Sequence, residues 1–256
     1  MEQVRLGLDD PTVLAGMGLF ETLALHGGRP LELEQHLSRL SAAASRLGLT
    51  CPEVGSLRRT LLDAGAELPY EQGWLKLILT GLGRSIVFCG PCEGSEGRSE
   101  ASAVLLPWRR NPSDPLAGLK TLNYAPNLIG MAAARERGAD EGIWLNTRGH
   151  LAEGCTSNLF VVQGRKLFTP REGEGILPGV LRAIVLRASR GLGIATHEGK
   201  VRLRRLQQAR EAFLTSSLQG VRPLVRFQGR PVGPGRPGPI TLRIAAEVRR
   251  RRGLAE

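Results

Sequence analysis

Apolar side chains in the first hundred residues follow two periods, one typical of helices and one typical of strands. Residues 32–47 place apolar side chains at helical spacing, and Gly48 supplies the stop at the end of that pattern. A second helical pattern covers residues 57–64. Apolar or alternating runs predict strands, and Gly27-Gly28 closes the first of them into a hairpin. The strands expected here are residues 14–25, 29–31, 74–80, 85–89 and 103–108.

Two prolines and a glycine interrupt the pattern at residues 109–118, which we interpret as a linker between domains. Beyond it, Pro126 opens a helix that runs to about Arg137. The side chains expected on its inward face are Leu128, Met131 and Ala134. The remaining predicted elements are strands at residues 142–145, 159–162, 166–169 and 212–214, a helix that starts near Gly179, and a last helix at residues 240–250.

The net charge of +11 raises the question of a nucleic-acid partner, but the distribution of the arginines does not favour one. Lys and Arg total 35, and the arginines are scattered over nearly every predicted element. Only residues 202–205 and 249–252 are dense basic runs. Neither is interleaved with the aromatic side chains of a single-strand stacking platform. We therefore expect no nucleic-acid partner.

The hydropathy of the chain does not indicate a membrane protein. No apolar run approaches the roughly 20 residues of a membrane span. The first residues, MEQVRLGLDDP, are charged and lack the apolar core of a signal peptide. These features predict a cytoplasmic protein without a membrane partner.

Two of the four cysteines stand in the sequence C-G-P-C at residues 89–92, which is the spacing of thioredoxin-like redox motifs. That chemistry needs a helix N-terminus to activate the thiol, whereas a Gly/Ser-rich stretch follows here. A metal site would need a second Cys pair or a nearby His pair, and the sequence offers neither. We interpret the motif as a turn after a strand.

The strongest candidate chemistry lies in residues 119–160. Lys120 follows the Gly/Pro-broken segment, and Glu153 stands in a polar turn with Ser157 and Asn158. A lysine can form a Schiff base with pyridoxal phosphate, and an acid can hold the pyridine nitrogen protonated so that the ring accepts electrons. The pair therefore indicates a pyridoxal-phosphate site.

Lysines are scarce in this chain, which narrows the choice of the reactive amine. Arginine cannot lose its proton to take this role, and only four lysines are present. Lys76 lies in an alternating strand, where an outward-facing charge is the ordinary interpretation. Lys166 lies in a tight hairpin, and Lys200 lies among cations on an expected surface. Lys120 alone stands between a Gly-rich approach and a polar cluster.

Two places are suited to an anion such as the cofactor phosphate. A helix that starts at Gly179 presents the backbone N–H groups of Val180 and Leu181, and its dipole favours a negative charge. The hydroxyl cluster at residues 215–217 follows a strand and could supply further donors. Neither feature is specific alone, and a phosphate site is favoured because both accompany the lysine and the acid.

Six blocks of sequence, in the same order, match a known family. The blocks are GMGLFETL, LELEQHLSRL, RNPSDPLAGLKTLNY, LAEGCTSNLF, GILPGVLR and FLTSSLQGVRPL. Through them the chain resembles, over nearly its whole length, the fold-type IV pyridoxal-phosphate enzymes. This group includes branched-chain aminotransferases, D-amino-acid aminotransferases and 4-amino-4-deoxychorismate lyases. The resemblance implies an α+β fold like that of D-amino-acid aminotransferase, with domains at residues 1–108 and 119–256, the cofactor between them, and a homodimer.

The resemblance also implies roles for single residues. Lys120 matches the Schiff-base lysine and Glu153 the partner of the pyridine nitrogen. Arg39 matches the arginine that grips the phosphate, although the helical pattern alone would put it on a solvated face. Further cofactor contacts are implied for Tyr124 at the ring hydroxyl, for Val180 and Leu181 at the helix start, and for Ser216 and Ser217 in a second phosphate loop.

Details of the resemblance bear on the substrate. The aminotransferases commonly have threonine at the position of Leu181, whereas the lyases tolerate an apolar residue. D-amino-acid aminotransferases grip the substrate carboxylate with an R-x-H motif, but the comparable residues 83–86 contain no histidine. The stretch RNPSDPLAGLKTLN is similar to the lyase version of the lysine approach. Arg84 and Arg109 stay open as candidates for binding a carboxylate.

The resemblance thus favours a 4-amino-4-deoxychorismate lyase, which forms 4-aminobenzoate and pyruvate in folate biosynthesis. The alternative is an aminotransferase of branched-chain or D-amino acids, which would use the same lysine and acid.

Overall fold

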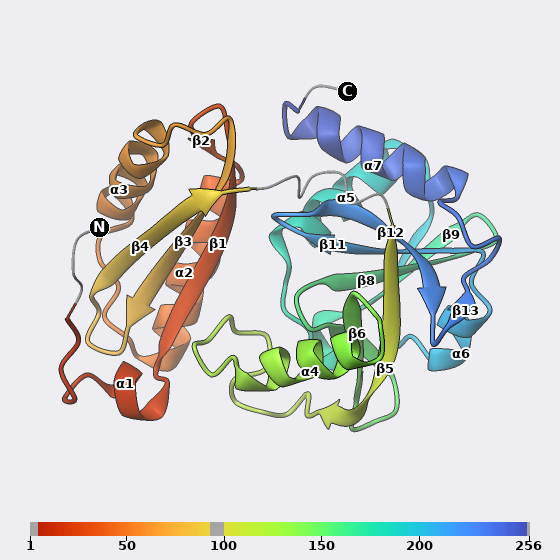
Figure 1. Cartoon of the computed structure of the whole chain (residues 1–256), viewed down its shortest axis with the longest axis horizontal. Helices are drawn as coiled ribbons and strands as arrows, with labels where there is room; N and C mark the ends of the chain where they lie inside the picture. Colours follow the sequence, from red (N-terminus) through yellow and green to blue (C-terminus); the bar gives the residue numbers. More distant parts are fainter. Residues whose placement is uncertain (1–4, 93–99, 255–256) are drawn as a thin grey trace. The chain divides into compact units, whose positions relative to one another are not determined.

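The computed structural model describes residues 5–92 and 100–254. The chain forms two compact units (Figure 1). Unit 1 comprises residues 1–93 together with the later segment 119–124, and unit 2 comprises residues 94–118 and 125–256. The mixture of helices and sheets confirms the predicted α+β class.

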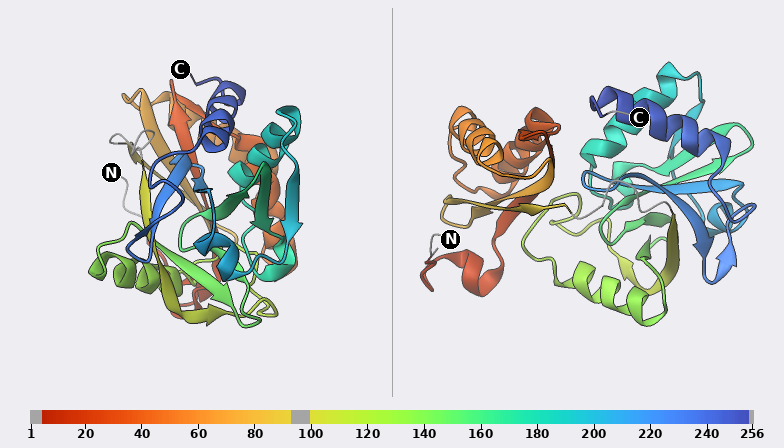
Figure 2. Two further views of the ribbon diagram at one scale, coloured as in Figure 1. Left: turned by 90° about the vertical axis from the view of Figure 1, so that its right-hand side faces the viewer. Right: turned by 45° about the horizontal axis from the view of Figure 1, so that its top comes forward.

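Unit 1 is a four-stranded antiparallel sheet with helices on one face (Figure 2). Its elements are α1 (Pro11–Ala15), β1 (Gly18–His26), β2 (Arg29–Pro30), α2 (Leu33–Leu47), α3 (Val54–Ala66), β3 (Gln72–Thr80) and β4 (Ser85–Pro91), and the strand order is β2-β1-β3-β4. Alternate residues of β1 and β3 point to the helices, because successive strand side chains face opposite sides. Leu23, Leu75 and Leu77 thus pack with Leu37 and Leu40 of α2 in one core.

Unit 2 is built on a nine-stranded, curled, mixed sheet. Its elements are β5 (Ala101–Arg110), α4 (Ala125–Glu136), β6 (Glu141–Asn146), β7 (Leu151–Gly154), β8 (Asn158–Gln163), β9 (Lys166–Pro170), the 3₁₀ turn η1 (Glu172–Glu174), α5 (Val180–Gly191), β10 (Thr196–Gly199), α6 (Leu203–Gln207), β11 (Glu211–Ser216), β12 (Gly220–Phe227), β13 (Arg230–Pro231) and α7 (Pro239–Arg251). The strand order is β10-β9-β8-β11-β12-β5-β6-β7, with β13 on β12.

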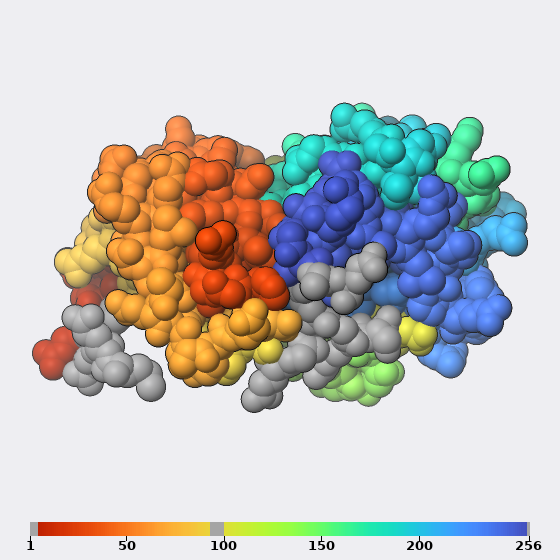
Figure 3. All heavy atoms as spheres, turned by 90° about the horizontal axis from the view of Figure 1, so that it is seen from above, coloured from red at the N-terminus to blue at the C-terminus, as the bar shows by residue number. Residues whose placement is uncertain are grey.

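Strand β8 of unit 2, between β9 and β11, is buried on both faces. Leu159 and Val161 belong to a core inside the curled sheet, whereas Phe160 and Val162 belong to the core beneath α5 and α7. A strand covered on both faces has a continuous run of apolar residues in its sequence, as residues 159–162 have. The two covering helices lie side by side on the surface of unit 2 (Figure 3).

The boundary between the units differs from the predicted one. Strand β5 pairs with β6 and β12 and so belongs to unit 2, although the sequence analysis assigned residues 103–108 to the first domain. The predicted linker at residues 109–118 also lies within unit 2. Its prolines and glycine mark the loop that follows β5, because loops and linkers share the same composition.

Most predicted helices and strands are present, but the inward face of α4 was predicted only in part. Ala134 is buried and Met131 packs partly buried against the core, as predicted, whereas Leu128 is exposed and Gly130 is buried in its place. A Cβ on Gly130 would lie 2.6 Å from Cys155 Sγ and 3.0 Å from Leu106, so this face of α4 approaches the sheet closely. A small residue therefore marks the buried side of the helix better than a large apolar one. Among the described residues, no helix has the length and apolar character needed to cross a membrane.

Candidate active site

Lys120 belongs to unit 1, on the short segment that runs beside the start of β1. The Phe20 amide donates a hydrogen bond to the Lys120 carbonyl at 2.9 Å, and the Leu122 amide donates to the Gly18 carbonyl at 3.0 Å. These two backbone bonds attach the segment to the strand on either side of the lysine. The position of Lys120 is therefore set by the sheet of unit 1.

The amine of Lys120 lies against aromatic rings. Its Nζ is 4.2 Å from the ring centroid of Phe20 and 5.7 Å from that of Tyr124, and the two rings meet edge to face at 5.1 Å. The Nζ of Lys76 lies 5.2 Å from the centroid of the same Phe20 ring. The structure thus brings two predicted site residues, Lys120 and Tyr124, together. It also places a second lysine near them, which the sequence analysis interpreted as an outward-facing charge.

Arg39 extends from α2 to a buried carboxylate on β1. Its Nε donates to Glu21 Oε1 at 2.8 Å and its Nη2 to Glu21 Oε2 at 2.5 Å, while His36 Nδ1 lies 2.7 Å from the same Oε2. Burial alone would raise the pKa of Glu21, but the charge and hydrogen bonds of Arg39, together with those of His36, lower it to about 2. Arg39 is therefore ordered and paired, not solvated as the helical pattern indicated. Its contact with a phosphate stays a prediction.

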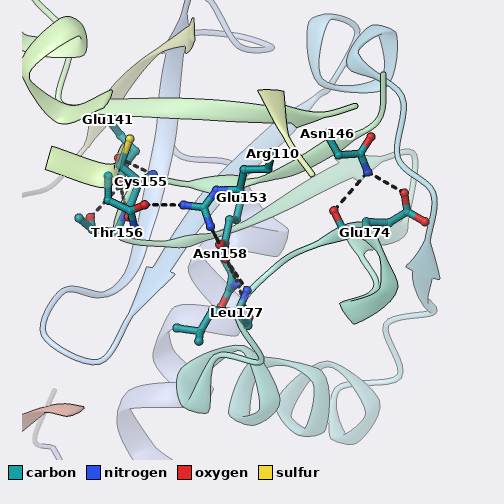
Figure 4. Close-up of polar contacts among 10 residues, drawn as sticks. Arg110, Glu141, Asn146, Glu153, Cys155, Thr156, Asn158, Glu174 and Leu177 are labelled. Carbon is teal, nitrogen blue, oxygen red and sulfur yellow. Dashed lines mark hydrogen bonds and ion pairs between the residues drawn. The ribbon is translucent and has the colours of Figure 1, made fainter. Parts of the chain in front are cut away.

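Glu153 lies on β7 in unit 2, and its carboxylate is surrounded by donors (Figure 4). Arg110 Nη1 donates to Oε1 at 2.8 Å, and Asn158 Nδ2 and the Leu177 amide donate to Oε2 at 3.1 and 2.9 Å. The residue is only 5% exposed. Three donors, one of them a cation, stabilise an ionised carboxylate in such a buried place.

Asn158 connects Glu153 to the start of helix α5. Besides its bond to Glu153, its Nδ2 donates to the Leu177 carbonyl at 2.9 Å. Its Oδ1 lies so close to Gly179 that a Cβ added there would be 1.9 Å away. Only glycine fits at this N-cap, which makes no side-chain capping bond. The N–H groups of Val180 and Leu181 follow directly after it, as the sequence predicted.

The serines of the second predicted phosphate loop lie at the end of the neighbouring strand. Asn158 on β8 pairs with Thr215 on β11, and Ser216 and Ser217 come next along the chain. Ser216 Oγ accepts a hydrogen bond from the Gln219 amide at 3.2 Å, which shapes the turn into β12. In unit 2, the structure therefore gathers the acid, the helix start and the serine turn around Asn158.

Two further buried carboxylates shape the backbone around Glu153. Glu141 accepts hydrogen bonds from the Cys155 amide, Thr156 Oγ1 and Ser157 Oγ, at 2.9 to 3.0 Å. Burial raises the pKa of Glu141, against the effect of these donors. Glu174 accepts from Asn146 Nδ2 at 2.9 Å, just before the segment that supplies the Leu177 amide (Figure 4). Sequence reasoning missed both, because an isolated Glu in a strand or loop carries no signal of burial.

Arg84 and Arg109, which the sequence left open as carboxylate-binding residues, are both exposed. Within the described ranges, 5–92 and 100–254, neither arginine contacts a predicted site residue. Cys89 lies within β4 and Cys92 immediately follows that strand, so no helix begins in the described part of the C-G-P-C motif. The motif therefore forms the end of β4, and the predicted turn after the strand was wrong in its position, because the pairing with β3 continues to Pro91.

Comparison with known proteins identifies the family. The sequence profile of the Amino-transferase class IV family matches residues 18–227, which is most of the chain. This chain belongs to the class IV aminotransferase family. It is a pyridoxal-phosphate-dependent enzyme, and pyridoxal phosphate is its cofactor.

Relatives of this class IV enzyme include proteins named for two different reactions. It is 26% identical, over 95% of its length and 90% of the relative's, to a protein of Methanocaldococcus jannaschii described as a candidate branched-chain-amino-acid aminotransferase. It is 29% identical to the aminodeoxychorismate lyase of Bacillus subtilis, over 86% of its length and 80% of the relative's. The family is thus shown, and the reaction within it is left open.

Similar solved structures also include both a protein named as a lyase and a protein named as an aminotransferase. A candidate 4-amino-4-deoxychorismate lyase of Legionella pneumophila matches with a TM-score of 0.89 and 26% identity, over 97% of this chain and 96% of that one. A hypothetical aminotransferase of Mycobacterium tuberculosis in its pyridoxal-phosphate-bound form matches with a TM-score of 0.86 and 26% identity, over 96% and 92% of the two chains.

The residues of the class IV enzyme fit the cofactor. A buried carboxylate surrounded by hydrogen-bond donors suits a protonated ring nitrogen, and Glu153 accepts from Arg110, Asn158 and the Leu177 amide. A helix start without a side-chain cap suits a phosphate, and Gly179 leaves the N-terminus of α5 in that state. Lys120 carries the amine that we predict for covalent attachment of the cofactor.

Replacing Arg39 with alanine is expected to weaken binding of pyridoxal phosphate by about 10- to 100-fold while lowering kcat at saturating cofactor much less. The change removes the charge-assisted phosphate contact predicted for Arg39, and a contact of this kind is worth about 1.5–3 kcal/mol. The measurement is titration of the apoenzyme by visible absorbance, with Arg59→Ala on the exposed face of α3 as the matched control. Because Arg39 also pairs with Glu21, the Tm of each apoenzyme is recorded. A lower Tm with unchanged cofactor affinity would assign Arg39 a structural role alone.

Proposed function

We propose that this enzyme is a 4-amino-4-deoxychorismate lyase that releases 4-aminobenzoate and pyruvate. The observation that carries the proposal is Leu181, whose side chain is 1% exposed and packs in the core beneath α5 and α7. This position offers no hydroxyl at the start of α5, where the aminotransferases commonly have threonine. The 29% identity to the Bacillus subtilis lyase gives further support.

Bound pyridoxal phosphate supplies an electron sink for the electron pair left when the substrate loses the proton at its amine-bearing carbon. The neutral amine of Lys120 takes that proton as a general base. The C–O bond to the enolpyruvyl group then breaks, the substrate ring becomes aromatic, and the enolpyruvate released takes up a proton to give pyruvate. Lys120 returns its proton during this last stage and is ready for another turnover.

The other site residues hold the reactants in place. We assign Glu153 to the ring nitrogen of the cofactor, where its negative charge, kept by three donors, favours a protonated ring. The amides of Val180 and Leu181, the serines Ser216 and Ser217, and Arg39 are assigned to the phosphate. Tyr124, whose ring lies beside the Lys120 amine, is assigned to the ring hydroxyl of the cofactor.

A second candidate function is transamination of a branched-chain or D-amino acid. It is favoured by the 26% identity, over 95% of the chain, to the Methanocaldococcus jannaschii protein. Transamination would use the same lysine and acid, but it needs a group that binds a carboxylate beside the amine, and an oxo acid that carries the amine away. Lys76, close to Phe20, and the exposed Arg84 and Arg109 are the cations available for testing.

Purified enzyme is expected to release 4-aminobenzoate from aminodeoxychorismate without any oxo acid present. The reaction is followed by the fluorescence of 4-aminobenzoate and by coupling pyruvate to lactate dehydrogenase. Parallel reactions contain branched-chain or D-amino acids with 2-oxoglutarate or pyruvate. Leu181→Thr serves as the matched variant, since it introduces the residue that aminotransferases commonly have at the start of this helix. Turnover only in the presence of an oxo-acid acceptor would show that the enzyme is an aminotransferase.

We also propose that the enzyme is a cytoplasmic homodimer in which the exposed apolar face of α4 is buried. Leu128 and Ile129 are 61% and 54% exposed on this helix. Adjacent large apolar side chains exposed to water in this way are typical of an interaction surface. Light scattering is expected to give twice the mass of the 27.7 kDa chain, and Leu128→Glu with Ile129→Glu is expected to halve it. Leu62→Glu, at another exposed apolar position, is the control. A double variant that stays dimeric would place the interface elsewhere.

A further inference from the structure

The carboxylate of Glu153 is paired with a cation that does not belong to the predicted site. Arg110, at the end of β5, donates from Nη1 to Glu153 Oε1 at 2.8 Å (Figure 4). The side chain of Glu153 is 6% exposed and that of Arg110 is 24% exposed. An ion pair this far from water is screened weakly, so the guanidinium acts strongly on the carboxylate.

Two further contacts fix the guanidinium of Arg110. Its Nη2 donates to Asn127 Oδ1 at 2.7 Å, and its Cζ lies 5.1 Å from the ring centroid of Trp144. Asn127 Nδ2 in turn donates to the Cys155 carbonyl at 2.6 Å. Cys155 stands two residues after Glu153, so this chain of contacts begins and ends on the same stretch of backbone. A closed ring of this kind allows the carboxylate little freedom to rotate.

We propose that Arg110 is a positioning residue that keeps the proton on the ring nitrogen of the cofactor and not on Glu153. The proposal rests on the assignment of Glu153 to that nitrogen. Between a pyridine nitrogen and a carboxylate, the proton lies where the two charges are best stabilised. The guanidinium stabilises the carboxylate anion, so the ring carries the proton and its positive charge. Without Arg110, the buried carboxylate takes the proton and the ring becomes neutral, which weakens it as an electron sink.

The geometry separates this role from that of a simple structural ion pair. Oε2 of Glu153 already receives the Asn158 and Leu177 donors, and these remain when Arg110 is replaced. The carboxylate would thus stay in place while its charge environment changed. An effect on ring protonation without a comparable loss of cofactor binding is the signature expected of Arg110.

The test uses holoenzyme reconstituted with pyridoxal phosphate that carries ¹⁵N in the ring. The measured quantity is the ¹⁵N chemical shift, which differs widely between protonated and neutral pyridine. The variants are Arg110→Gln and Arg110→Lys, with Arg165→Gln, at an exposed position between β8 and β9, as the control. We expect Arg110→Gln to move the ¹⁵N signal toward that of neutral pyridine. We also expect it to lower kcat by about 10- to 100-fold, because loss of a residue that supports a directly contacting side chain commonly has an effect of this size. Arg110→Lys, which keeps the charge, is expected to retain the protonated signal.

The outcomes separate this inference from the proposed function on which it rests. Glu153→Gln holoenzyme is measured alongside. If its ring signal equals that of the unmodified enzyme, Glu153 is not the ring partner, and the site assignment fails. If the signal moves in Glu153→Gln but not in Arg110→Gln, the site assignment stands and the role of Arg110 is overturned. Should Arg110→Gln fail to fold, Arg110→Met, which also removes the charge, takes its place. A ring signal that moves toward neutral pyridine in Arg110→Met but not in Arg110→Lys supports the proposal, and a signal that stays protonated in Arg110→Met overturns it.

Discussion

Lys120→Arg is expected to abolish turnover, lowering kcat by about 10⁴-fold or more. The guanidinium keeps its proton in proteins, so it can neither attach covalently to the cofactor nor take a proton from the substrate. The positive charge and much of the side-chain length are retained, and the contact with the Phe20 ring can still form. Loss of activity would therefore report lost chemistry and not lost folding, which circular dichroism and the Tm verify.

The structure makes Lys76 the natural control for this experiment. Its Nζ lies 5.2 Å from the centroid of the Phe20 ring, against 4.2 Å for Lys120, whereas Lys166 and Lys200 are exposed. Lys76→Arg is expected to keep both the yellow colour of the holoenzyme and most of its activity. After borohydride reduction, peptide mapping by mass spectrometry should place the cofactor on the peptide that contains Lys120. Cofactor mass on the Lys76 peptide would overturn the assignment of the reactive lysine.

Glu153→Gln is expected to lower kcat by about 10²- to 10³-fold while weakening cofactor binding only a few-fold. The amide keeps the shape of the side chain but loses the negative charge that favours a protonated ring nitrogen. Cofactor binding is expected to depend chiefly on the predicted phosphate contacts and on Lys120, which the change leaves intact. The measurements are kcat and the dissociation constant of pyridoxal phosphate, with Glu172→Gln at an exposed position nearby as control.

This result would be opposite in kind to that of Arg39→Ala, which is expected to affect cofactor affinity more than turnover. Equal effects of the two substitutions on both quantities would argue against the assigned roles. The Tm of Glu153→Gln is expected to fall, because Arg110 then loses its anionic partner in a largely buried place. The fall in Tm is expected to be smaller when Glu153→Gln is combined with Arg110→Gln. A double-mutant cycle then measures the coupling between the two side chains.

Residues whose role follows from local pattern were accessible from the sequence. The apolar spacing of residues 33–47 defines α2 and its Gly48 stop, and the continuous apolar run at residues 159–162 defines the buried β8. Lys120 could be singled out because a chain with four lysines offers few candidates, and Glu153 because it stands in a polar turn with Ser157 and Asn158. In each case the signal lies within a short stretch of sequence.

Contacts between distant segments were not accessible in this way. Glu21 and Arg39 are 18 residues apart, and Arg110 and Glu153 are 43 apart, so neither pair has a local signature. The buried side of α4 likewise depends on the sheet that it meets at Gly130, which helical spacing alone does not reveal.

The segment at residues 119–124 affects how the protein is made. Leu19 pairs with Thr121, and the backbone of Phe20 bonds to Lys120, so the edge of β1 is completed by residues about a hundred positions later in the chain. During synthesis, the strands and helices of residues 18–91 emerge from the ribosome well before this segment does. Until it arrives, one end of β1 presents unpaired backbone groups of the kind that recruit other chains. The stretch that carries the predicted reactive lysine therefore also completes the edge of β1, so unit 1 is expected to be protected from misassembly only after this stretch has been synthesised.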